Sequence, residues 1–125
     1  AFFAPSQDRI QLPHKNTFTD AGSYYATAFH ELVHWTGAES RLNREFGKRF
    51  GDNRYAFEEL VAEMGAAFLC QDYRIKGELR HAGYIQSWLK ALRNDSKAVF
   101  KAAALAQKAA DYINNCDATL GEIAA

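Results

Sequence analysis

Hydrophobic positions at helical spacing dominate the pattern of this chain. An apolar run from Ser23 to Thr36 predicts a helix, which Thr19 or Asp20 can cap and which Gly37 ends. Apolar side chains surround this helix on nearly every side. We therefore expect it to be buried in the core.

Three more helices are expected after the first one. The second is predicted from Asn53 to Asp72, the third from His81 to Arg93 and an alanine-rich fourth from Ser96 to about Ile113, with the tail 114–125 fraying. Each has an apolar stripe at spacings of three and four residues, which is typical of a helix with one buried face. The stripes are Phe57, Val61, Met64 and Phe68; Tyr84, Ile85, Trp88, Leu89 and Leu92; and Val99, Phe100, Ala103, Ala106, Ala110 and Ile113.

Polar and apolar residues alternate clearly only near the start of the chain. Residues 7–13 alternate and then stop at Pro13, which predicts one short strand at a sheet edge. Such a strand is either purely structural or a place where an extended peptide pairs with the backbone. Residues 38–53 and 73–80 are expected to be loops, the second turning at Gly77. The fold class predicted for residues 1–125 is one α+β, mostly α domain of about four helices with a small edge sheet.

Composition and charge exclude several classes of protein. With 48% apolar residues in 125, the chain is long enough for a single core. Fifteen basic and fifteen acidic residues cancel, so no overall field favours nucleic acid or a membrane, and no apolar run approaches a membrane span. Two isolated cysteines form neither a disulfide framework nor a cysteine zinc cluster. A reducing cytoplasm and no membrane partner are therefore expected.

Positive charge gathers in only one place, the loop of residues 41–54. Two phenylalanines lie among the basic residues of this loop. The loop is either a solvated surface or a contact for a nucleic-acid backbone or an acidic peptide. Its basic residues are Arg41, Arg44, Lys48, Arg49 and Arg54, against Glu45 and Asp52.

The first predicted helix contains the sequence His-Glu-Leu-Val-His at residues 30–34. Residues four apart lie nearly above one another, about 6 Å along a helix, so His30 and His34 can bind one ion. Two imidazoles suit Zn²⁺, and Glu31 is then placed to accept a proton from water activated by that ion. The alternative is a pair of core histidines that are hydrogen-bonded to backbone or carboxylate groups.

Two glutamates share one face of the second predicted helix. Glu59 and Glu63 are four residues apart, and burying them on so apolar a helix is costly unless a cation and a metal-bound imidazole compensate. Glu58 lies about 100° away around the helix and is expected to face solvent or form a salt bridge. Cys70 is on the Glu59 face, where we expect it to pack rather than to bind metal.

The third predicted helix offers a possible hydrogen-bond donor for the reaction. Peptide hydrolysis develops negative charge on the carbonyl oxygen, which a Tyr hydroxyl or a His ring N–H can stabilise. His81 and Tyr84 are the candidates. The other interpretation of Tyr84 is a member of the apolar stripe.

The combined motifs resemble a known family. His-Glu-x-x-His followed by Glu59-x-x-Ala62-Glu63 resembles the gluzincin arrangement, although Glu63 replaces the usual closing Asp. Together with residues 24–27, 40–42 and 84–89 (Tyr-Tyr-Ala-Thr, Ser-Arg-Leu and Tyr-Ile-Gln-Ser-Trp-Leu), it resembles the C-terminal zincin-like domain of ArdC-type antirestriction proteins. TraC-type conjugative primases carry a similar domain.

The resemblance implies a zinc-dependent peptidase from a bacterial mobile element, acting on a peptide or protein. It implies that His30, His34 and Glu59 hold the Zn²⁺, that Glu31 is the general base and that Glu63 orients a ligating histidine. It also implies a region binding single-stranded DNA before residue 1, and because the chain does not begin with Met, we expect a C-terminal fragment. The alternative is a catalytically inactive, metal-stabilised domain that acts in DNA binding or protection against restriction.

Overall fold

Helix α2 (Asn53–Asp72) packs against each of the other three helices. The computed structural model describes residues 1–46, 53–76, 81–93 and 95–124, and the side chains as far as residue 116. The predicted class, mostly helical with a small sheet, is confirmed. The other elements are β1 (Phe2–Ala4), β2 (Arg9–Gln11), the 3-10 turn η1 (Lys15–Thr17), α1 (Ala21–Thr36), α3 (His81–Ala91) and α4 (Ser96–Ala124).

Both ends of α1 are defined by local contacts. At the start, the Asp20 carboxylate accepts a hydrogen bond from the backbone N–H of Ser23 at 2.7 Å. Gly37 follows the last residue and has an ordinary helical conformation, with φ −79°. A Cβ on Gly37 would come within 2.8 Å of the Arg44 guanidinium and the Phe46 ring. The glycine therefore allows the following loop to fold back over the end of α1.

Small residues let α1 and α2 approach closely. A Cβ on Gly65 would lie 2.7 Å from Cγ2 of Val33, which is a clash. Val33 and Leu60 are both completely buried where these helices meet. The close contact brings the carboxylates of α2 within reach of the histidines of α1.

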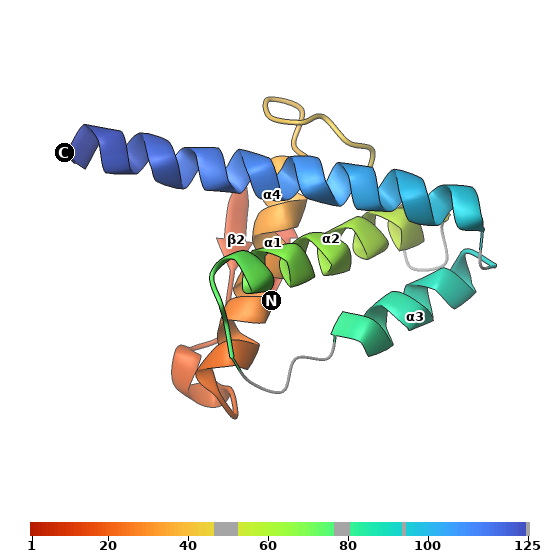
Figure 1. Ribbon diagram of the computed structural model, residues 1–125, viewed down its shortest axis with the longest axis horizontal. Helices are drawn as coiled ribbons and strands as arrows, with labels where there is room; N and C mark the ends of the chain where they lie inside the picture. The colour runs from red at the N-terminus through yellow and green to blue at the C-terminus, as the bar shows by residue number, and fades with distance from the viewer. Residues whose placement is uncertain (47–52, 77–80, 94, 125) are drawn as a thin grey trace.

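Alanines attach α4 to the rest of the core. Ala102, Ala106 and Ala110 are fully buried and belong to the same cluster as Leu60 and Leu69 of α2. Because alanine adds little bulk, the two helices can lie close together. Figure 1 shows α4 running along α2 and passing over α1, with its C-terminal end projecting beyond them.

Three expectations about burial were wrong. Helix α1 is not buried all round, since Tyr25 remains 38% exposed, and two stripe residues lie outside the core: Tyr84 is 53% and Phe100 77% exposed. Periodicity identifies a broad apolar face, but only the part of that face that meets another element is covered.

The predicted boundaries hold with two differences. Helix α2 has its expected bounds, α3 ends two residues early, and α4 continues to Ala124 where we expected a fraying tail. The Asn114 amide accepts a hydrogen bond from the Tyr73 hydroxyl and donates one to Asp72, which holds this part of α4 to the end of α2. The expected turn at Gly77 lies outside the described residues.

The sheet has one strand more than expected. β2 lies inside the predicted 7–13 segment, and β1 pairs with it antiparallel, with Phe3 opposite Ile10. Strand β1 was missed because its residues, Phe-Phe-Ala, are all apolar and show no alternation. None of the described helices is both long enough and apolar enough to cross a membrane.

Candidate metal centre

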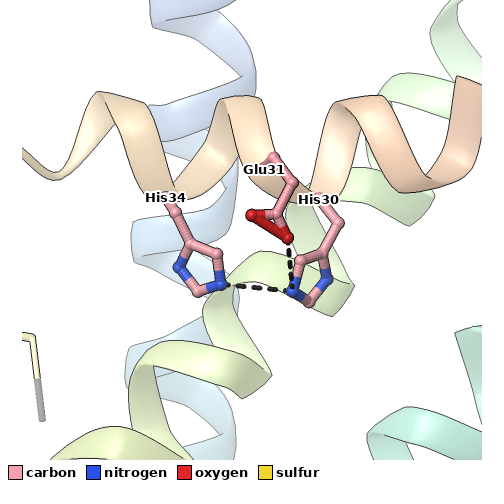
Figure 2. Close-up of side chains that lie close together, drawn as sticks. All are labelled: His30, Glu31 and His34. Atoms are coloured by element: carbon pink, nitrogen blue, oxygen red, sulfur yellow. Dashed lines mark hydrogen bonds and ion pairs between the residues drawn. The ribbon is translucent and has the colours of Figure 1, made fainter. Parts of the chain in front are cut away.

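Helix α1 presents three potential ligands on one side. His30, Glu31 and His34 project together toward α2, as Figure 2 shows, and one ligand atom from each lies within 4.8 Å of the others. Glu31 and His34 are buried, at 6% and 9% exposure. The i and i+4 spacing therefore places both imidazoles in one protected region.

Glu59 of α2 completes a tighter cluster with the two imidazoles. The Nε2 atoms of His30 and His34 are 3.1 Å apart. Glu59 Oε2 lies 3.0 Å from the first Nε2 and Glu59 Oε1 lies 3.2 Å from the second, whereas the nearest Glu31 oxygen is 3.8 Å from His30 Nε2. Geometry therefore favours Glu59 over Glu31 as the third ligand and leaves Glu31 beside the cluster.

The other nitrogen of each ring is held by a carboxylate. His30 Nδ1 lies 2.8 Å from Glu63 Oε1, and His34 Nδ1 lies 2.8 Å from Glu58 Oε2. An ionised carboxylate only accepts hydrogen bonds, so we assign a proton to each Nδ1. In the neutral rings, the lone pairs on both Nε2 atoms then face each other and Glu59. Such an arrangement suits a shared cation.

The pKa values of the metal-free cluster also indicate that its carboxylates stabilise a positive charge between them. Burial lowers the pKa of His30, but hydrogen bonds with Glu59 and Glu63 outweigh burial and raise this pKa to about 10. Burial raises the pKa of Glu59, yet hydrogen bonds from His30 and His34 outweigh it and lower this pKa to about 2. Without metal, a proton supplies the charge that a divalent ion would supply.

These residues fit a divalent metal ion. Two imidazoles and a carboxylate form a donor set that zinc enzymes use, and carboxylates on the far ring nitrogens orient such ligands. The alternative of two ordinary core histidines accounts for the Nδ1 contacts but not for two Nε2 atoms that converge on a third ligand. His30, His34 and Glu59 would hold the ion.

Glu58 has a position that the sequence reasoning did not anticipate. We expected it to face solvent or form a salt bridge. The salt bridge is present, with 2.8 Å between Arg44 Nε and Glu58 Oε1, but Glu58 is buried at 3% exposure and does not face solvent. Helical geometry alone puts Glu58 off the Glu59 face. Glu58 still contacts His34 because α1 lies across both the Glu58 and the Glu59 sides of α2. No local sequence pattern indicates how the two helices cross.

A cavity of about 560 Å³ opens beside Glu31. Its lining includes His30, Glu63, His81 and Tyr84, so the two predicted donors lie at this cavity. His81 Nδ1 is 3.5 Å from a Glu63 oxygen, too far for a good hydrogen bond, and neither His81 ring nitrogen has a partner among the described residues. Both ring nitrogens are buried, and Nδ1 faces the Glu63 carboxylate.

A second cavity, of about 270 Å³, lies on the other side of Glu31. Phe3, Phe46 and Tyr55 line it together with Glu58 and Glu59, so its wall combines aromatic rings with carboxylates. Because Glu31 borders both cavities, an extended chain crossing it would have space on either side.

Cys70 packs in the core, as expected. It is 3% exposed, and burial raises the pKa of its thiol to about 11. A metal ligand must be a thiolate, so a thiol that stays protonated near neutral pH is a poor ligand.

Metal binding is expected to release protons and to strengthen as pH rises. Because His30 has a folded-state pKa of about 10, its proton stabilises the metal-free fold fully below the usual value of 6.5, and this contribution disappears as pH rises through 10. A metal ion must displace that proton, so affinity should increase about tenfold per pH unit for each proton released.

Calorimetry in buffers of different ionisation enthalpy measures this release directly. We expect at least one proton per ion at pH 7. Binding that releases none between pH 6 and 8 would contradict the assignment of His30 as a ligand.

Comparison with known proteins identifies the family. Residues 1–105 match the family model described as zincin-like metallopeptidase (MPTase-PolyVal). The chain therefore belongs to the zincin-like metallopeptidase family, and the resemblance inferred from the motifs is confirmed.

Particular relatives include an antirestriction protein and a DNA primase. The chain is 46% identical to antirestriction protein ArdC of plasmid R388 in its Mn(II)-bound crystal structure, with a TM-score of 0.73 over 91% of this chain and 43% of that one. The metal-free ArdC structure gives 45% identity and a TM-score of 0.74, over 94% of this chain and 43% of that one.

Curated relatives agree with these structures. DNA primase TraC of Escherichia coli is 47% identical over 114 residues, which are 90% of this chain and 11% of TraC. Protein y4eC of Sinorhizobium fredii is 45% identical over 116 residues, 91% of this chain and 38% of its own. The chain thus spans less than half of each of these relatives.

Proposed function

We propose that this domain is a zinc-dependent peptidase that hydrolyses peptide bonds in a peptide or protein. The observation that supports it most strongly is Glu59 lying within 3.2 Å of both facing Nε2 atoms, with the Glu31 carboxylate at their side. His30, His34 and Glu59 would hold the ion, and Glu63 would orient His30. Glu31 remains free to act as the base.

The residues of the site have separate tasks in this reaction. A bound divalent ion polarises the substrate carbonyl and lowers the pKa of water. Glu31 accepts a proton from the attacking water and returns it to the leaving amine. His81 and Tyr84 line the same cavity and would donate hydrogen bonds to the carbonyl oxygen as it gains charge.

Zinc is the proposed metal because of the donor set. Nitrogen from two imidazoles and oxygen from one carboxylate are ligands that catalytic zinc sites combine. The crystal structure of the related ArdC protein holds Mn(II), and such a donor set also accepts Mn(II). Reconstitution with each metal in turn would compare their affinities and activities.

Single-stranded DNA is proposed as a partner that binds outside this domain. Within the domain, two basic residues of the 41–54 loop are engaged internally: Arg41 contacts Trp35 and Asp8, and Arg44 contacts Glu58. Their side chains are only 10% and 6% exposed, so they have little surface left for phosphate groups. The predicted contacts of Lys48, Arg49 and Phe50 lie outside the described residues.

Chelator-sensitive cleavage is the test of the proposed function. The zinc-loaded protein should cleave members of a mixed peptide library, cleavage should stop when the metal is removed, and it should return when zinc is restored. Mass spectrometry of the products would show the cleaved bonds. A protein that binds zinc and cleaves neither the library nor itself would instead favour the inactive, metal-stabilised domain.

A further inference from the structure

Arg44 lies at the junction between the two helices that carry the proposed ligands. Its guanidinium donates from Nη2 to the Val33 carbonyl at 2.6 Å and from Nη1 to the Thr36 hydroxyl at 3.0 Å, both in the last turns of α1. The same group donates from Nε to Glu58 Oε1 at 2.8 Å and from Nη2 to Glu58 Oε2 at 3.1 Å, on α2. One side chain therefore joins the end of α1 to the start of α2.

Glu58 transmits this contact to a histidine. Its Oε2 atom accepts from Arg44 and also from His34 Nδ1, at 2.8 Å. The two-point pairing with a planar guanidinium fixes the plane of the carboxylate, and the carboxylate in turn fixes the His34 ring and its tautomer. Lysine has no planar fork and would not hold Glu58 in the same way.

The surroundings leave this pair little freedom. Glu58 is 3% exposed and the Arg44 side chain 6%, so water competes weakly with their contacts. Gly37 leaves space for this group, because a Cβ there would lie 2.8 Å from Arg44 Nη2 and the guanidinium would have to shift. The fold thus makes room at the end of α1 for this guanidinium.

We propose that Arg44 and Glu58 are positioning residues of the metal centre, which hold His34 with its Nε2 lone pair directed at the shared ion. This inference rests on the metal site of the proposed function but not on hydrolysis. Neither residue touches the ion or the substrate. Their effect is on how tightly the site binds metal and on the hydrogen bond of His34.

Arg41 provides a matched control for Arg44. It comes from the same loop, is nearly as buried at 10% side-chain exposure, and also donates to a carbonyl at the end of α1, Trp35 O at 2.7 Å. Its carboxylate partner is Asp8 next to β2 rather than Glu58, and it stacks on the Trp35 ring at 4.1 Å. A variant at Arg41 therefore removes a comparable structural contact without touching His34.

The test compares Arg44→Met, Arg44→Lys and Arg41→Met by zinc competition with a chromophoric chelator. Arg44→Met should weaken zinc binding about 10- to 100-fold and Arg44→Lys by less, while Arg41→Met leaves the affinity unchanged. The outcome that overturns the proposal is a loss in Arg44→Met no greater than in Arg41→Met. Should Arg44→Met not fold, Arg44→Lys decides: parental affinity would refute the proposal.

Proton NMR of the histidine ring N–H signals provides a second measurement. A general loss of structure would not change the His34 signal alone. Both Nδ1 protons should resonate downfield, and Arg44→Met should shift or broaden only the His34 signal, leaving that of His30 beside Glu63 unchanged. The spectrum is also recorded without metal, so that the His34 hydrogen bond is tested apart from zinc binding. A parent that binds zinc but cleaves no peptide would refute the proposed function and leave this inference standing, whereas a parent that binds no zinc would refute both. Equal changes in the His30 and His34 signals would refute the positioning role of Arg44 and Glu58.

Discussion

Replacing Glu31 with glutamine is expected to abolish peptide hydrolysis while the metal and the fold remain. The amide fills the same space but cannot accept a proton from water, and a positioned general base contributes about 10²- to 10⁴-fold to rate. Glu31 is the only carboxylate of the described cluster that borders both cavities yet forms no close pair with a ring nitrogen; its nearest approach is 3.8 Å. Removing its charge should therefore lower the rate of hydrolysis much more than it changes metal binding or the fold.

The measurement combines cleavage rates with the zinc content and the melting temperature of each protein. Glu31→Gln should bind zinc as the parent does and unfold at a similar temperature, because the three proposed ligands are untouched. Glu39→Gln, at an exposed position of the following loop, controls for loss of one negative charge. Persistent chelator-sensitive cleavage in Glu31→Gln would show that another group is the base.

Glu59→Ala is expected to remove retained zinc, and Glu63→Ala to leave a weaker but measurable site. Glu59 faces both Nε2 atoms, at 3.0 and 3.2 Å, whereas Glu63 contacts His30 only at Nδ1, at 2.8 Å. Losing one of three protein ligands should cost well over about 100-fold, while losing a carboxylate behind a ligand typically costs about 10- to 100-fold.

The two variants control for each other, because they make the same change one helical turn apart on α2. Titration against a chromophoric chelator would rank their affinities. Both glutamates also have their pKa lowered despite burial, so circular dichroism should first establish that each variant folds. A metal-free Glu63→Ala beside a nearly normal Glu59→Ala would reverse the assignment of ligand and orienting residue.

Sequence alone determined the parts of this site that lie within one helix. The spacing of His30 and His34 places both rings on one side of α1, and the spacing of Glu59 and Glu63 does the same on α2. The bounds of α2 also follow from local patterns, and the cap of α1 is Asp20, one of the two residues that its sequence offered. Each depends on backbone geometry and on near neighbours in the chain, which a periodic pattern records directly.

Tertiary structure decided which residues meet across elements. Glu58 was expected to face solvent or form a salt bridge; it forms the salt bridge with Arg44, but the crossing of α1 over α2 also buries it against His34. Tyr84 fitted the core stripe of α3, yet it is 53% exposed and lines the cavity. Such contacts depend on the distance and the angle between packed helices. Gly65 permits the close approach of Val33, but a single glycine adds nothing to the periodic pattern of the sequence.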